Sequence, residues 1–289
     1  MPKTIAQALS EASEELNRSG VPEARKEAAA LLTHVLDVDR SFLIRNSEDM
    51  VDEAAFNRFR LLVERRASGE PAQYITGYQD FYGRRFKVNP DVLIPRPETE
   101  LLVENALSGI PFTDGFSVCD VGTGSGCIAI TVLCERPLVR AVALDVSERV
   151  LQLARGNAEA LGVADRIQFV KSDCFDALPT SAKFDLIISN PPYVSANVLP
   201  GLQREVRDHE PVVALSPGED GLTIIRRLLI DAPAFLKPEG RLFMEIGFDQ
   251  GDAVGNLVEP NVWQLVDMIP DLQQIPRIVV LKKLPAAGR

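Results

Sequence analysis

From residue 117 onward, short apolar segments of strand-like composition alternate with segments of helical periodicity. The strand-like segments are 117–121, 140–145, 167–170, 184–189, 241–246, 263–269 and 278–281, and helix-like segments at 126–134, 147–161, 222–235 and about 250–258 lie between most of them. This alternation predicts an α/β fold with a mostly parallel sheet. Ligands of such sheets bind in the loops after the carboxyl ends of the strands, so chemistry is expected there.

Residues 1–70 show helical periodicity instead. The apolar positions are Ile5, Leu9, Ala12 and Leu16 in a first helix, Ala28, Leu31, Leu32, Val35 and Leu36 in a second, and Phe56, Phe59, Leu62 and Val63 in a later one. Pro22 fits the first turn of the second helix, and the later helix is expected to end near Gly69. The pattern predicts an N-terminal helical bundle over 1–70, which we interpret as a recognition module.

Residues 71–95 are rich in aromatic and β-branched side chains, interrupted by Gly83 and by Asn89-Pro90. This composition predicts a β-hairpin that links the helical bundle to the α/β domain at 96–289. Arg84, Arg85 and Lys87 form a short basic cluster in this segment. Such a cluster is either a solvated face of the hairpin or a docking surface for a macromolecule.

The composition excludes several classes of partner. With 31 Lys and Arg against 41 Asp and Glu, the net charge is −10, so direct nucleic-acid binding is not expected. The chain has no run of about 20 apolar residues and no signal-peptide pattern at its start. Its four cysteines show no CxxC spacing and it has two histidines, which argues against a metal site. We therefore expect a cytoplasmic protein with reduced cysteines.

The loop after the first predicted strand has the sequence DVGTGSGC, from Asp120 to Cys127. Its members Gly122, Thr123, Gly124, Ser125 and Gly126 let backbone approach a ligand, and the helix that follows offers unpaired N–H groups. A nicotinamide fingerprint requires a glycine at the position of Cys127. The GxGxG pattern instead resembles motif I of the class I S-adenosylmethionine (SAM) methyltransferases. A generic glycine-rich loop is the alternative interpretation.

Two further loops carry candidate cofactor contacts. Asp145 ends the second predicted strand, where an acid can accept hydrogen bonds from both hydroxyls of a ribose. The alternative is that Asp145 or Ser147 merely caps the next helix. The third loop contains Asp173 and Cys174, in the position where methyltransferases of this class contact adenine, or else forms a solvated turn.

The loop after the fourth predicted strand reads Asn190-Pro191-Pro192-Tyr193. Two prolines restrict the backbone and remove two N–H donors, and the Asn190 side chain adds a carbonyl oxygen. These acceptors suit an NH₂ group, and Tyr193 offers a flat face for a planar system. The sequence resembles motif IV of methyltransferases that act on the nitrogen of an amide, adenine or guanine.

The nucleophile of such a reaction needs orientation more than a strong base. An amide nitrogen is a poor nucleophile because its lone pair is delocalised into the carbonyl. Acceptors placed for both N–H groups orient the nitrogen. The hydrogen bonds to these acceptors strengthen as positive charge develops on the nitrogen during methyl transfer. Such a reaction therefore does not require a histidine as general base near Asn190, and the sequence has none there.

Over nearly its whole length the chain resembles the HemK/PrmC family, the glutamine N5-methyltransferases of class I peptide chain release factors. The resemblance rests on QYI at 73–75, GYQDFYGRRF at 77–86, LIPRPETE at 93–100, DVGTGSG at 120–126, NPPY at 190–193, and the segments at 210–211, 214–215 and 220–222. It implies a class I SAM-dependent methyltransferase domain, Rossmann-like with a mostly parallel seven-stranded sheet, behind an N-terminal domain that helps hold the release factor. It implies the glutamine of a Gly-Gly-Gln motif as the target.

The resemblance also implies roles for single residues. Gly122–Gly126, Asp145, Cys174 and Asn190 fall at SAM contacts, and Asn190–Tyr193 falls at the glutamine pocket, with Leu93 lining it. Many relatives have an aromatic residue near position 174, so Cys174 leaves open whether it or Phe175 lies against the adenine.

Three rival functions remain compatible with parts of the pattern. A DNA or RNA methyltransferase acting on adenine N6 or guanine N2 would place a flipped base in the same pocket, but the net charge of −10 argues against it. A non-catalytic protein with a SAM-like fold is disfavoured by the intact glycine loop and Asn190. A nicotinamide oxidoreductase is weakened by Cys127.

Overall fold

The computed structural model describes residues 3–113 and 115–285, and the chain divides into two compact units. Unit 1 contains the chain up to Tyr78 together with Leu202–His209. Unit 2 contains Gln79–Gly201 and the chain from Glu210 onward. The short segment 202–209 therefore belongs to the helical unit although it lies inside the sequence of the other.

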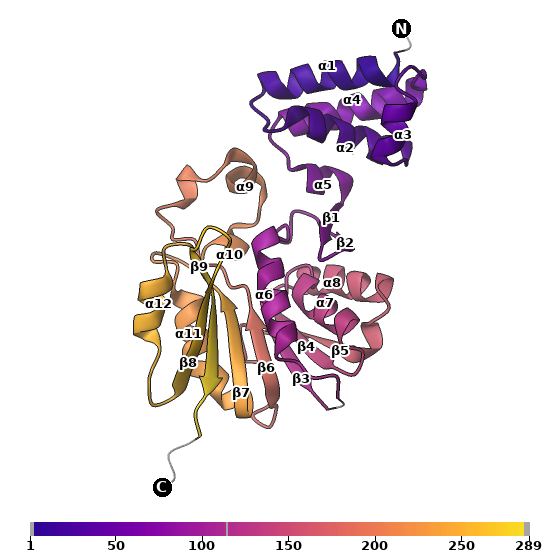
Figure 1. The fold of residues 1–289 in the computed structure, drawn as a ribbon. Helices are drawn as coiled ribbons and strands as arrows, with labels where there is room; N and C mark the ends of the chain where they lie inside the picture. Colours follow the sequence, from indigo (N-terminus) through magenta and orange to yellow (C-terminus); the bar gives the residue numbers. More distant parts are fainter. Residues whose placement is uncertain (1–2, 114, 286–289) are drawn as a thin grey trace. The chain divides into compact units, whose positions relative to one another are not determined.

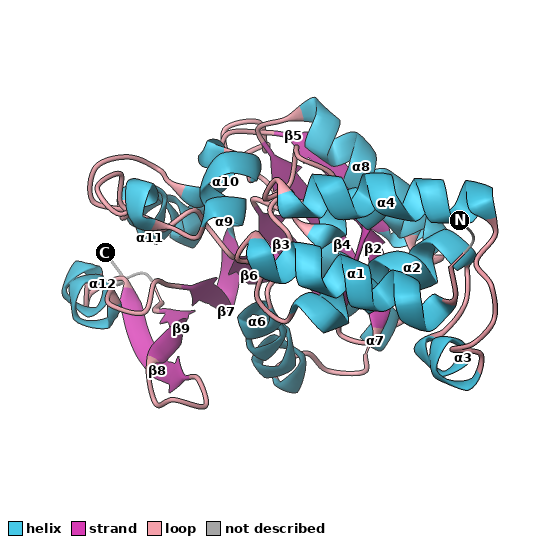
Figure 2. Cartoon of the chain, turned by 90° about the horizontal axis from the view of Figure 1, so that it is seen from above, coloured by secondary structure: helices cyan, strands magenta, loops and turns pink. Residues whose placement is uncertain are grey.

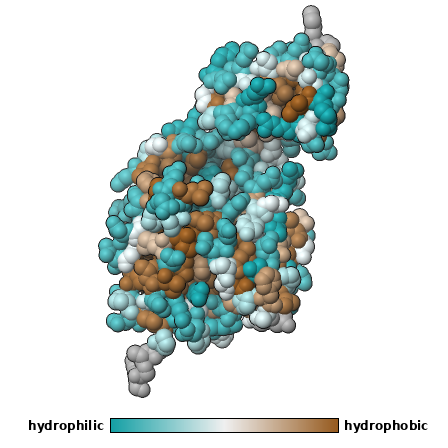
Figure 3. All heavy atoms as spheres, viewed as in Figure 1, coloured by the Kyte–Doolittle hydropathy of each residue, from teal (hydrophilic) through white to brown (hydrophobic). Residues whose placement is uncertain are grey.

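Unit 1 is helical, as the periodicity of residues 1–70 predicted (Figure 1). Its helices are α1 (Ile5–Arg18), α2 (Ala24–Leu36), α3 (Arg40–Arg45), α4 (Glu53–Ala67), α5 (Ala72–Thr76) and α9 (Arg204–His209). Side-chain oxygens of Thr4, Asp39 and Asp52 cap α1, α3 and α4 by accepting backbone N–H bonds. The apolar faces of α1, α2 and α4 meet in one core that includes Leu16 and Phe59. Hydrophilic atoms cover most of the face of this unit seen in Figure 3.

Two local predictions in unit 1 were wrong, and two short helices were not predicted individually. Helix α2 begins at Ala24 rather than at Pro22, because Glu23 adopts a left-handed conformation with φ of 50°. Helix α5 lies where aromatic and β-branched composition predicted hairpin strand, since Tyr74 and Ile75 are buried on a short helical turn. Helices α3 and α9 have six residues each, too few for a periodic apolar pattern to show in the sequence.

A buried arginine fastens α9 to unit 1. Arg66 of α4 has a side chain that is 6% exposed, and its Nε donates to Glu27 of α2 at 2.8 Å. Its Nη2 donates to Glu205 of α9 at 2.7 Å, and its Nη1 donates to the carbonyl oxygen of Glu70 at 3.3 Å. One guanidinium therefore joins three segments, and its charge is matched by two carboxylates.

The predicted hairpin is present as β1 (Tyr78–Phe81) and β2 (Arg84–Lys87). Tyr82 and Gly83 connect the strands with positive φ at both positions, as a type I′ turn requires. Asn157 anchors β2 by bonding both the N–H and the carbonyl of Lys87, at 2.8 and 3.0 Å.

The basic cluster of the hairpin is partly neutralised by neighbouring acids. Arg84 pairs with Glu135 at 2.6 Å, and Arg85 pairs with Asp80 at 3.3 Å. Two of the three basic residues thus have a carboxylate partner within unit 2, which reduces the positive field that the sequence alone suggested.

Unit 2 is built on a seven-stranded sheet, which confirms the predicted α/β class. Its strands are β3 (Ser117–Val121), β4 (Arg140–Asp145), β5 (Ile167–Lys171), β6 (Phe184–Ser189), β7 (Leu236–Glu245), β8 (Trp263–Pro270) and β9 (Pro276–Lys283). Their order is β5-β4-β3-β6-β7-β9-β8. The pairs from β5 to β7 are parallel, and β9 runs antiparallel to both of its neighbours.

Helices cover both faces of this sheet (Figure 2). One face packs against α6 (Pro97–Ser108), α7 (Cys127–Glu135) and α8 (Glu148–Ala160), and the other packs against α11 (Thr223–Phe235) and α12 (Gly251–Leu257). Side chains alternate between the two cores along each strand, so Val118 faces one and Cys119 faces the other. A short helix, α10 (Val212–Leu215), and the turns Ala164–Arg166 and Leu199–Gly201 complete the unit.

The strand order reverses beside β3. The chain passes from β3 outward to β4 and β5, and then returns to place β6 on the opposite side of β3. Such a switch point opens a crevice beyond the carboxyl ends of the strands, here those of β3 and β6. Among the described residues, no helix combines the length and the apolar character needed to cross a bilayer.

Candidate active site

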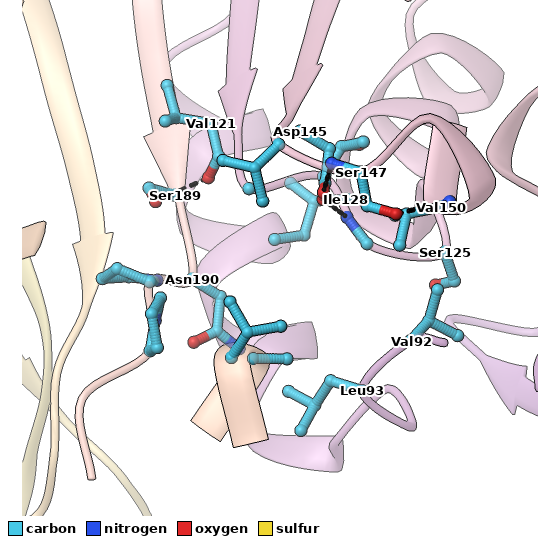
Figure 4. Close-up of a pocket in the computed structure, with 18 of the residues that line it drawn as sticks. Val92, Leu93, Val121, Ser125, Ile128, Asp145, Ser147, Val150, Ser189 and Asn190 are labelled. Atoms are coloured by element: carbon cyan, nitrogen blue, oxygen red, sulfur yellow. Dashed lines mark hydrogen bonds between the residues drawn. The ribbon is translucent and has the colours of Figure 1, made fainter. Parts of the chain in front are cut away.

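A cavity of about 190 Å³ lies at this switch point. The predicted site residues that line it are Leu93, Gly122, Thr123, Gly124, Ser125, Asp145, Asp173, Cys174, Asn190, Pro191 and Pro192. Figure 4 shows Asp145 and Asn190 on different walls of the cavity. The lining does not include Gly126, Phe175 or Tyr193. The fold thus brings most of the predicted residues from four strand ends to one cavity.

The glycine loop follows β3 and leads into α7. Gly122, Gly124 and Gly126 all have positive φ, of 74°, 55° and 83°. Gly122 and Thr123 donate their backbone N–H groups to the carbonyl of Leu144, each at 2.9 Å, which holds the loop against β4. Gly126 has a φ that other residues rarely adopt, and a Cβ there would lie 2.6 Å from Ile130 Cδ1 and 3.3 Å from Ala154 Cβ, so a larger residue would be strained.

Asp145 is held by backbone donors at the end of β4. Its Oδ2 accepts the N–H of Gly124 at 3.1 Å, and its Oδ1 accepts the N–H of Ser147 at 3.0 Å. The helix cap is supplied by Ser147, whose Oγ accepts from Val150 at 3.4 Å. Burial raises the pKa of Asp145, while these backbone bonds oppose the rise. Each carboxylate oxygen keeps a second lone pair, so a ligand hydroxyl can still donate to it.

Asp120 is a buried acid whose role the sequence did not reveal. Its Oδ2 accepts from the Thr123 hydroxyl at 2.7 Å and from the N–H of Ala129 at 3.3 Å. Its Oδ1 has no hydrogen-bond partner among the described residues. Burial raises the pKa of Asp120 to about 6. The residue ties the glycine loop to the first turn of α7.

The third loop brings Cys174, and not Phe175, to the cavity. Cys174 has a φ of 46° and lines the cavity, and burial raises the pKa of its thiol to about 11. The Phe175 ring stacks on Phe235 with centroids 4.9 Å apart, inside the core beneath α11. Asp173 pairs with Arg227 at 2.8 Å, so its carboxylate already has a cationic partner.

A chain of hydrogen bonds runs inward from Asn190. Its Nδ2 donates to the Thr99 hydroxyl at 3.0 Å, and Thr99 donates to Glu245 Oε2 at 2.7 Å. The Tyr193 hydroxyl donates to Glu245 Oε1 at 3.1 Å. Glu245 is 2% exposed, and burial raises its pKa to about 7. Burial and the nearby carboxylate also raise the pKa of Tyr193.

The backbone around Tyr193 is clamped from the other side. Gln250 Nε2 donates to the Tyr193 carbonyl at 2.9 Å, and Gln250 Oε1 accepts the N–H of Gly247 at 2.9 Å. A Cβ at Gly221 would lie 2.3 Å from the same Tyr193 carbonyl, so only glycine fits there. This contact explains why the segment at 220–222 accompanies the Asn-Pro-Pro-Tyr loop.

Two other segments complete the wall near Asn190. Arg96 pairs with Glu210, which is buried and also accepts the backbone N–H of Ile94 at 3.4 Å. This pair joins the segment 93–100 to the start of α10, whose Val213 and Ala214 line the cavity with Leu93. Both segments carry the family resemblance, but their separation in the sequence gives no sign that they meet.

Two family descriptions match this chain. Residues 7–77 match the PrmC N-terminal domain, and residues 97–202 match the methyltransferase small domain. The matched ranges fall on the helices of unit 1 and on the part of unit 2 that carries the glycine loop and Asn190.

Curated relatives align over almost the entire chain. A release factor glutamine methyltransferase of Cereibacter sphaeroides is 45% identical over 282 residues, covering 98% of this chain and 99% of the relative. One of Koribacter versatilis is 42% identical over 280 residues, covering 97% and 99%. Among solved structures, a methyltransferase from Pyrococcus furiosus superposes with a TM-score of 0.53 at 16% identity, covering 79% of this chain and 99% of the other, which supports the fold.

Proposed function

Because the chain belongs to the release factor glutamine methyltransferase family, we propose that it methylates the side-chain amide nitrogen, N5, of a glutamine in class I peptide chain release factors. The target is the glutamine of the Gly-Gly-Gln motif, the methyl donor is SAM, and the second product is S-adenosylhomocysteine. The observation that carries this proposal is the Asn190 side chain, which lines the same cavity as the glycine loop and Asp145.

The residues at one side of the cavity suit SAM. The proposed contacts on this side are Gly122, Thr123, Gly124, Ser125, Asp145, Asp173 and Cys174, with Asn190 on the other wall; Gly126 lies outside the cavity lining and supports the loop. Asp145 keeps lone pairs for ribose hydroxyls, and apolar side chains such as Val146 and Val150 line the same cavity. The loop supplies backbone without large side chains. When bound, SAM supplies an electrophilic methyl group on a sulfonium.

The other side suits a planar amide. We assign the glutamine pocket to Asn190, Pro191 and Pro192, with Leu93 beside them; Tyr193 lies outside the cavity lining, with its hydroxyl bonded to Glu245. Asn190 uses its Nδ2 on Thr99, so its Oδ1 is the end of the side chain that can accept an N–H of the target. Accepting that hydrogen bond orients the nitrogen and becomes stronger as the nitrogen gains positive charge. The proton that the nitrogen then loses is acidic, so no strong base is required.

Unit 1 is the proposed contact for the body of the release factor, in the cytoplasm where translation takes place. Its residues 7–77 match a domain described for PrmC, and its α9 lies further along the chain from the loop Asn190–Tyr193. The net charge of −10 disfavours the rival function on a nucleic-acid base.

The test is direct methylation by the full chain. The protein is incubated with labelled SAM and a purified release factor, and the labelled residue is mapped by mass spectrometry. A factor in which the Gly-Gly-Gln glutamine is alanine serves as the matched control, and DNA and RNA are offered in parallel. Label on that glutamine supports the proposal; label in a nucleic-acid base, or none on protein, overturns it.

A further inference from the structure

We infer that Thr99 and Glu245 are positioning residues that decide which end of the Asn190 side-chain amide faces the cavity. The inference rests on the proposed function, because it concerns the acceptor that would hold the target amide. It assigns a task to Thr99, which lies in the segment 93–100 that carries the resemblance but was given no role there, and to Glu245, which no motif singled out.

The direction of each hydrogen bond follows from the groups involved. A carboxylate only accepts, and a threonine hydroxyl has a single proton. Thr99 lies 2.7 Å from Glu245 Oε2, so its proton goes to the carboxylate. Its oxygen, 3.0 Å from the Asn190 amide, is then left to accept, and only the NH₂ end of Asn190 can donate to it. Asn190 Oδ1 is thereby turned away from Thr99 and is available to a substrate N–H.

Protonation of Glu245 would reverse the direction of these hydrogen bonds and the orientation of the Asn190 amide. If Glu245 were protonated, it could donate to Thr99, which would then donate to Asn190 Oδ1 and turn the NH₂ group toward the substrate. Two NH₂ groups facing each other cannot form the required bond. An active site therefore needs Glu245 as a carboxylate.

The groups around Glu245 make its protonation depend on pH near neutrality. It is fully buried, which favours the protonated form, and the nearby Glu98 adds to that effect. Bonds from Thr99 and Tyr193 and the charge of Arg277 favour the carboxylate. The balance places its pKa at about 7, so activity should rise as pH increases through that value.

The first test removes the Thr99 hydroxyl. Thr99→Val should lower kcat on the release factor about tenfold, the effect of one hydrogen bond, and leave SAM affinity within about twofold. Thr99→Ser keeps the hydroxyl and should restore most of the rate. Thr131→Val is the matched control, because Thr131 is fully buried on α7 and its hydroxyl has no partner among the described residues.

A double-mutant cycle separates positioning from general damage. If Thr99 acts through Asn190, Thr99→Val should cause no further loss of kcat in an Asn190→Ala background. Glu245→Gln provides a second measurement that holds even if Thr99→Val folds poorly. Its amide can donate to Thr99, so kcat should fall and the rise of kcat with pH near 7 should disappear.

The outcomes distinguish the inference from the function on which it rests. Normal kcat in Thr99→Val and an unchanged pH profile in Glu245→Gln, with Asn190→Ala inactive, would overturn the positioning role and leave the function standing. An Asn190→Ala enzyme with wild-type kcat would overturn the proposed acceptor itself.

Discussion

Arg66 in unit 1 and Glu245 in unit 2 are both buried, but their hydrogen-bond partners differ. In unit 1 Arg66 is matched by the carboxylates of Glu27 and Glu205 and by a backbone carbonyl. In unit 2 Glu245 receives hydrogen bonds from two neutral hydroxyls, those of Thr99 and Tyr193. Both residues are almost fully buried, so the contrast lies in the partners and not in the exposure.

The contrast separates a structural role from a functional one. A buried charge that is fully paired holds segments together, and its pairing is closed to further ligands. A buried acid that is bonded only by neutral groups keeps a raised pKa and costs stability, which proteins accept mainly at functional sites. Changes around Glu245 and Asn190 should therefore affect turnover, whereas changes at Arg66 should affect folding.

The largest effect is expected at Asn190. Asn190→Ala should lower kcat about 10²–10³-fold, by analogy with the loss of one preorganised hydrogen-bond partner of a transition state. The thermal midpoint should be retained, because the side chain bonds only Thr99 within the described protein. Most SAM affinity should also be retained, because the glycine loop and Asp145 on the other wall are unchanged. Steady-state methylation of a release factor and calorimetric titration of SAM measure the two quantities. A near-normal kcat would show that Asn190 and the groups bonded to it in unit 2 have no functional role in methyl transfer.

The second-largest effect is the contribution of Glu245 to the pH dependence of the free energy of unfolding. The folded protein keeps a proton on Glu245 up to a pH of about 7, whereas the unfolded chain loses it near 4.5. Between these values the folded state binds more protons, so the free energy of unfolding falls as pH rises, by up to about 3 kcal/mol. Glu245→Gln should lose this share of the slope in urea titrations between pH 5 and 8. An identical slope in wild type and variant would show that Glu245 does not have a raised pKa in the folded protein.

Substitution of Asp145 should lower the affinity for SAM without lowering stability. Asp145→Ala should weaken SAM binding by about 1.5–3 kcal/mol, the value of hydrogen bonds to a charged group. Calorimetry measures the affinity, and a thermal melt checks that the protein stays folded. Unchanged affinity in a folded variant would leave Asp145 with its loop contacts to Gly124 and Ser147 alone.

The smallest effect is expected at Arg66. Arg66→Met should destabilise unit 1 by about 1–2 kcal/mol, because Glu27 and Glu205 lose their partner but are partly exposed to solvent. Urea unfolding measures this change, and SAM affinity, which belongs to unit 2, should not move. A loss of SAM affinity with unchanged stability would mean that the two buried charges do not differ as described.

Much of the site could be predicted because it follows strand ends. The loops with Gly122, Asp145, Cys174 and Asn190 each come directly after a predicted strand, and parallel strands bring their carboxyl ends to one edge. The prediction was less successful for Phe175, which stacks on Phe235 away from the cavity. Both residues lie in the turn after β5, which ends at Lys171, and Cys174 has a φ of 46°; local sequence does not show which of the two side chains such a turn directs to the cavity.

Other contacts of the site join residues that are far apart in the sequence. Thr99 and Glu245 are 146 positions apart in the sequence, and Arg66 and Glu205 are 139 apart. The hints are the place of Thr99 in the segment 93–100 and the acid near the end of the apolar run 241–246, since a carboxylate there must find partners in the interior. Nothing near it in sequence says which partners those are.

By itself the sequence determined the alternation of strands and helices, the glycine loop and the Asn190-Pro191-Pro192-Tyr193 acceptor, because propensity, backbone freedom and acceptor chemistry belong to short stretches of residues. Only the tertiary structure decided that Arg66 is neutralised and Glu245 is not. The reason is physical: the direction of a hydrogen bond and the proton affinity of a buried acid depend on atoms contributed by distant segments and on the exclusion of water, both of which exist only after the chain has folded.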